Sequence, residues 1–167
     1  GWNTLGVLQW RVDELDAATE SYGRVLQLGR RSGDQGAIAA AIANMALVDI
    51  KRANFSRSEG MLRKAISVQH AIGDAESIAD NYGNLGSLHL VRGEYELAEA
   101  MFRKSLALDE QRNHKAGIAS NLGSLAIIHQ RRDELGEAEA LFHQALDIDV
   151  ELGRKEEMAT SYSRLGD

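Results

Sequence analysis

The 167-residue chain contains no cysteine and no proline, and only 5% of its residues are aromatic. The absence of cysteine excludes disulfides and thiolate metal sites. No apolar run approaches the roughly 20 residues that a membrane-spanning helix needs, so we expect no membrane insertion. The chain is instead rich in Ala, Leu, Glu and Arg, a composition typical of helices. No alternating β-branched pattern is present, so we expect an all-α protein without strands.

Charge and motifs limit the possible functions. The net charge of -6 argues against a general nucleic-acid binder, because phosphate binding requires concentrated Lys and Arg. The sequence has no Ser-His-Asp spacing, no Gly-rich phosphate loop and no HExxH motif. We therefore expect neither an enzyme nor a bound cofactor, and we expect a cytoplasmic location.

The chain repeats itself every 40 residues without a gap. When it is written in rows of 40, the fifth column contains Leu5, Met45, Leu85, Leu125 and Leu165. A large apolar column further along contains Tyr22, Leu62, Phe102 and Phe142. Each row predicts two one-sided helices, because its apolar residues recur at i, i+3 and i+4. One such pair cannot bury its apolar faces alone, so we expect stacked pairs that share a continuous core.

Glycine and aspartate mark the breaks between the expected helices. In Gly33-Asp34 and Gly73-Asp74, the glycine suits the left-handed position after a helix and the aspartate caps the next one. Asn113-His114 stands at the same place one row later. The helices that we expect span 1–12, 16–31, 35–52, 56–72, 75–92, 96–112, 115–132, 136–152 and 155–166.

The third row carries the residues of a known repeat, namely Tyr82, Leu85, Gly86, Gly93, Tyr95, Ala98, Phe102 and Leu106. On these residues the chain resembles the tetratricopeptide repeat family, and its long units without proline are similar to those of kinesin light chains and LGN/Pins-type adaptors. The resemblance implies a right-handed α-solenoid of antiparallel helical hairpins. The repeats would span 1–34, 35–74, 75–114 and 115–154, with a partial repeat at 155–167. We expect one array, and a fragment of a longer protein.

The resemblance also implies a ligand groove lined by the first helix of each hairpin. Polar candidates on the face turned away from the core are Asn44, Asn84, Ser87 and Ser124. Apolar candidates on this face are Trp10, Leu47, Val91 and Ile127. Basic candidates near the helix ends are Arg11, Lys51 and Arg131. Amides can bond both N–H and C=O groups of a peptide, and cations would attract acidic ligand residues. The alternatives are solvated polar residues, apolar residues buried between repeats, and cations that complement helix dipoles.

Two histidines, His89 and His129, share a column one repeat apart. Two imidazoles without a third ligand make a poor metal site, so we expect packing and no metal.

The last expected helix has no hairpin partner within the sequence. Tyr162 and Leu165 occupy core columns there. We expect either self-association through 155–167 or a frayed helix, since a short isolated helix is marginal in water.

The function that these patterns favour is a scaffold that binds a protein or peptide in its groove. A regulatory segment of a multidomain bacterial signalling protein and a self-assembling array are the alternatives.

Overall fold

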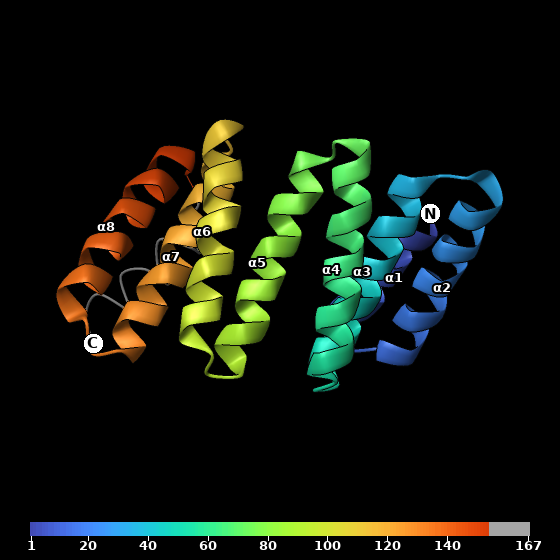
Figure 1. Cartoon of the computed structure of the whole chain (residues 1–167), viewed down its shortest axis with the longest axis horizontal. Helices are drawn as coiled ribbons and strands as arrows, with labels where there is room; N and C mark the ends of the chain where they lie inside the picture. The colour runs from blue at the N-terminus through green and yellow to red at the C-terminus, as the bar shows by residue number, and fades with distance from the viewer. Residues whose placement is uncertain (154–167) are drawn as a thin grey trace. The chain divides into compact units, whose positions relative to one another are not determined.

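The computed structural model describes residues 1–153. These residues form eight α-helices and no strand. The helices are α1 (Trp2–Arg11), α2 (Leu15–Ser32), α3 (Gln35–Lys51), α4 (Phe55–Ile72), α5 (Ala75–Val91), α6 (Tyr95–Gln111), α7 (Lys115–Arg131) and α8 (Leu135–Leu152). Their ends agree within one residue with those expected (Figure 1). The expected helix at 155–166, and with it Tyr162, Leu165 and the predicted self-association, lies outside the described residues.

Left-handed residues end the helices at a strict interval of 20 residues. The described residues with positive φ are Asp13, Gly33, Ala53, Gly73, Gly93, Asn113, Asp133 and Gly153. A new helix starts two residues after each of Gly33, Gly73 and Gly93. Asp34 and Asp74 act as predicted, accepting hydrogen bonds from the backbone N–H groups of Ala37 (2.9 Å) and Ser77 (3.1 Å).

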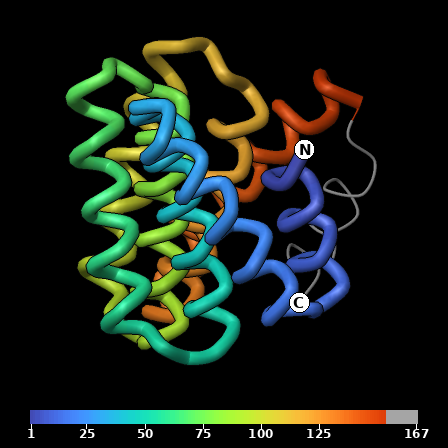
Figure 2. The backbone as a smooth tube through the Cα atoms, turned by 90° about the vertical axis from the view of Figure 1, so that its right-hand side faces the viewer, coloured from blue at the N-terminus to red at the C-terminus, as the bar shows by residue number. Residues whose placement is uncertain are grey.

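The chain divides into two compact units, residues 1–84 and 85–167, with the boundary inside α5. In unit 1, α1 to α4 pack in sequence as neighbours, and Figures 1 and 2 both show α1 beside α2. Tyr22 is buried at the centre of one cluster with Ala18 and Val48, and its burial raises the pKa of its phenol. Gly6 lies directly against this ring, since a Cβ there would come within 2.5 Å of Tyr22 Cε1.

One core expectation for unit 1 is wrong. Leu5 stands in the column whose other members Leu85 and Leu125 are buried, yet it is 40% exposed. No helix precedes α1 among the described residues, so nothing there covers this side of α1. Burial in a stacked array requires a neighbour on both sides, which the column position alone does not supply.

A second core lies in unit 2. It is shared by the C-terminal end of α5 and by the helices α6, α7 and α8. Phe102 is buried with Ala98, Leu125 and Ile128, and Gly86 lies against its ring. Farther along, α7 and α8 pack around another cluster, formed by Ala126, Ala138 and Phe142. Phe102 and Phe142, which share a column of the repeat, therefore both lie buried between helices, as their spacing predicts.

Buried polar pairs connect a second helix to the first helix of the next hairpin at two places, between α4 and α5 and between α6 and α7. In unit 1, the Asn81 side-chain amide donates to Gln69 Oε1 at 2.9 Å. In unit 2, the equivalent Asn121 amide donates to Asp109 Oδ2 at 2.9 Å, and His114 Nδ1 lies 3.0 Å from Asp109 Oδ1. These pairs satisfy side chains that would be costly to bury alone.

Candidate functional site

The candidate residues fall into both units. Unit 1 contains Trp10, Arg11, Asn44, Leu47, Lys51 and Asn84. Unit 2 contains Ser87, Val91, Ser124, Ile127 and Arg131. The basic candidates, Ser87 and Val91 are exposed, and the others are half-buried.

The polar column is engaged in hydrogen bonds within the chain. The Asn44 amide donates to Asn3 Oδ1 at 2.9 Å, linking α3 to α1. The Asn84 amide reaches Asn81 Oδ1 at 3.4 Å, and the Ser124 hydroxyl donates to the Ser120 carbonyl at 2.9 Å. A ligand that uses these groups would share them with the contacts already made.

In unit 1, the basic candidate Lys51 is satisfied internally. Its Nζ donates to the Trp10 carbonyl at 2.8 Å and to Asp13 Oδ1 at 3.0 Å. The same ammonium lies 4.5 Å from the centroid of the Trp10 ring, within the range of a cation–π contact. The Lys51 ammonium is therefore already engaged by a carbonyl, a carboxylate and an indole of the same chain.

In unit 2, the structure brings three candidates together around one open hollow. The hollow has a volume of about 400 Å³ and is lined by Leu90, Val91, Gly93, Tyr95, Ile127 and Arg131. We call it the Arg131 hollow. It lies where the turn between α5 and α6 meets the last turns of α7. Its size falls within the usual range for small-ligand sites, and its walls combine apolar side chains with one cation.

Arg131 is the basic residue that lines this hollow. Within the described part of the chain, no hydrogen bond or ion pair involves its guanidinium. The adjacent Arg132 differs, because its guanidinium donates to Glu99 at 2.6 Å and to Glu96 at 3.2 Å. The hydrogen bond with Glu99 raises the pKa of Arg132.

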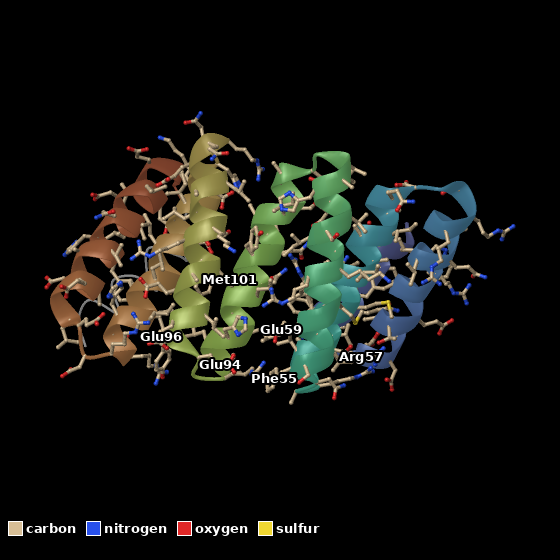
Figure 3. The ribbon with its side chains drawn as sticks, in the orientation of Figure 1. Phe55, Arg57, Glu59, Glu94, Glu96 and Met101 are labelled. Carbon is tan, nitrogen blue, oxygen red and sulfur yellow. The ribbon has the colours of Figure 1, made fainter. Side chains whose placement is uncertain are left out.

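The carboxylates of Glu94, Glu96 and Glu99, at the start of α6, are already occupied. Figure 3 shows Glu94 and Glu96 at the end of α6 that follows the turn. Glu94 pairs with His89 Nδ1 and with Arg92, both at 2.7 Å, and Glu96 pairs with Arg132. Hydrogen bonds from Arg103 and Arg132 hold the pKa of the Glu99 carboxyl below its usual value. None of these acids is therefore bonded to Arg131.

His89 and His129 pack against the protein as expected, and each also lies beside a carboxylate. His89 is buried, and His129 is nearly so. Each faces the glutamate five residues later, with His129 Nδ1 lying 2.6 Å from Glu134 Oε2. Across residues 1–153, no group of three or more His, Cys, Asp or Glu side chains is placed to hold a metal ion. None of the helices in this part of the chain is both long enough and apolar enough to cross a bilayer.

Gly93 and Tyr95 of the Arg131 hollow were not among the candidates, whereas Leu90 extends the predicted apolar column. Gly93 and Tyr95 stood out in the sequence only as parts of the repeat motif. Comparing the repeats column by column could have pointed to Gly93, because it stands where the first repeat has Asp13. Its meaning depends on knowing that Asp13 holds Lys51.

Comparison with known proteins identifies the family. Sequence models of the tetratricopeptide repeat match residues 38–111 and residues 118–148. The chain belongs to the tetratricopeptide repeat family. No curated protein sequence matches this tetratricopeptide repeat chain.

Solved structures share the fold of this tetratricopeptide repeat chain at low sequence identity. BtubC (BKLC) from P. vanneervenii matches with a TM-score of 0.78 and 21% identity, over 91% of this chain and 63% of that one. The Rap conjugation gene regulator of plasmid pLS20, solved in complex with a peptide, matches with a TM-score of 0.88 and 16% identity. That match covers 96% of this chain and 44% of the regulator. A putative kinesin light chain from Podosopora anserina matches with a TM-score of 0.72 and 14% identity, over 99% of this chain and 85% of that one. The chain thus spans less than two thirds of the first two proteins.

Proposed function

We propose that the chain is a protein–protein interaction module that binds a peptide or helix on the face formed by the first helices of its hairpins. The observation that carries this proposal is the Arg131 hollow, which combines a cation without a partner and apolar walls on the predicted ligand face. Apolar side chains beside a cation offer a ligand both packing contacts and a charge-assisted hydrogen bond. The peptide complex of the Rap regulator supports it at the level of fold. A regulatory segment that senses a peptide would use the same face.

The test is capture of a partner by the chain, followed by mass spectrometry and affinity measurement. The first variant combines Asn84→Ala with Leu47→Asp. The second is Val91→Asp, which alters a side chain that is 67% exposed and should leave the fold intact. Loss of a packed anchor should weaken binding by ~2 kcal/mol, about 30-fold.

The matched control is Lys64→Ala, an exposed change on the second-helix surface of α4. Circular dichroism melting confirms that each variant is folded. We expect the control to bind like the original chain. Unchanged affinity in both groove variants would show that the ligand face is elsewhere.

A further inference from the structure

The Arg131 hollow has a counterpart in unit 1, 80 residues earlier in the sequence. Arg131 corresponds to Lys51, Gly93 to Asp13, and Leu90 to Trp10. In unit 1, Asp13 accepts a hydrogen bond from Lys51 at 3.0 Å and the Trp10 ring lies under the ammonium. In unit 1, the chain's own Asp13 carboxylate thus binds the cation at this position of the repeat.

In unit 2, this internal carboxylate is missing. Gly93 has φ 73° and Asp13 has φ 65°, so the two residues share a left-handed backbone. A Cβ built on Gly93 would meet no heavy atom within 4 Å outside its chain neighbours, so a side chain could start there without a clash. Gly93 and Arg131 line the same hollow, whereas the equivalent residues in unit 1, Asp13 and Lys51, are bonded to each other.

The two acids that follow Gly93 most closely do not take the place of Asp13. Glu94 is bonded to His89 and Arg92, and Glu96 is bonded to Arg132. An arginine in such a place offers several N–H donors in the planar arrangement that suits a carboxylate. The apolar walls beside it supply a surface for a neighbouring aliphatic side chain.

We propose that the Arg131 hollow binds the side-chain carboxylate of an aspartate or glutamate in a peptide ligand, as Asp13 binds Lys51 in unit 1. An apolar residue next to that acid packs between Tyr95 and Ile127. The proposal rests on the proposed function, and it names the ligand chemistry and confines the carboxylate site to unit 2. Lys51, which already holds Asp13, takes no part in it.

The test introduces the missing carboxylate. Gly93→Asp places an internal acid beside Arg131, and aspartate tolerates the left-handed conformation. Gly93→Asn is the matched control, because asparagine has nearly the same shape and backbone tolerance without the charge. The probe is the tetrapeptide alanine–leucine–aspartate–alanine, acetylated and amidated so that its only carboxylate is a side chain. A second peptide carries asparagine in place of the aspartate.

Binding is followed by NMR, through the Ile127 methyl signal and the Arg131 Nε–H signal. We expect the aspartate peptide to shift both signals, and the asparagine peptide to bind about tenfold more weakly, since a charge-assisted bond is lost. Gly93→Asp should reduce the affinity for the aspartate peptide about tenfold, whereas Gly93→Asn should retain most of it. Equal binding of the two peptides, equal effects of the two variants, or no shift with 10 mM peptide (about the limit for a single weak contact) would each overturn the proposal.

The partner assay separates this proposal from the broader one. If a captured partner is lost with Asn84→Ala plus Leu47→Asp but retained with Gly93→Asp, the ligand face is supported and the carboxylate assignment is wrong. If all of these variants retain it, the ligand face itself is wrong.

Discussion

Gly117 offers a sharp test of how the buried polar pair in unit 2 constrains the sequence. Replacing a helical glycine by alanine usually stabilises a protein by up to ~1 kcal/mol, since alanine has the higher helix propensity. At Gly117, in the first turn of α7, the new Cβ would lie 2.3 Å from Asp109 Oδ2 and 2.5 Å from its Cγ. No atom pair tolerates such an approach, so the Asp109 carboxylate must move.

The cost of that movement follows from the contacts of Asp109. The residue is 3% exposed and its carboxylate is bonded to the amide of Asn121 and faces His114. Loss of a hydrogen bond to a buried charged group costs ~1.5–3 kcal/mol. After allowing for the gain in helix propensity, we expect Gly117→Ala to destabilise the protein by ~1–2 kcal/mol.

The assay is urea unfolding followed by far-UV circular dichroism, with both the midpoint and the slope compared. Gly123→Ala is the control, because Gly123 lies in the same helix and a Cβ there meets nothing within 4 Å. We expect this control to stabilise the protein by ~0.5–1 kcal/mol, the opposite sign. In an Asp109→Ala background the penalty at Gly117 should disappear, since the clashing group is gone. A Gly117→Ala protein as stable as the Gly123→Ala protein would refute the reasoning.

Two further predictions concern local stability. The folded pKa of Glu99 is lowered by Arg103 and Arg132, so its contribution is present above the usual carboxyl pKa of about 4.3 and is lost as pH falls below that value. Glu99→Gln should therefore lower the free energy of unfolding by ~0.5–1 kcal/mol at pH 7 and by less at pH 3, and an equal loss at both pH values would contradict this. Asp34→Ala should cost ~1 kcal/mol by thermal unfolding, because the Ala37 N–H loses its cap, while Asp34→Asn should restore most of it. An alanine variant as stable as the original would show that the cap contributes nothing.

Local interactions explain why the helices and their ends could be predicted. Left-handed residues such as Gly33 and caps such as Asp34 act within one turn of the chain, so their pattern is visible in a short stretch of sequence. The 40-residue repeat then aligned the core columns, and Leu85 and Leu125 are buried as expected. Leu5 is exposed because burial also depends on a covering neighbour, which a column does not specify.

The candidate site could be predicted only in outline. The sequence and its family resemblance predicted a ligand face and assigned Val91, Ile127 and Arg131 to it. It also contained the difference between Asp13 and Gly93, but it gave no reason to connect either residue with a cation 38 positions later.

Only the tertiary structure decided which cation is available to a ligand. Lys51 and Arg131 occupy equivalent positions and carry the same charge, yet Lys51 is held by Asp13 and Trp10, while Arg131 lines an open hollow. Charge is a property of each residue and can be read from the sequence. Whether that charge is already neutralised depends on distances between side chains from different helices, and those distances are set by packing.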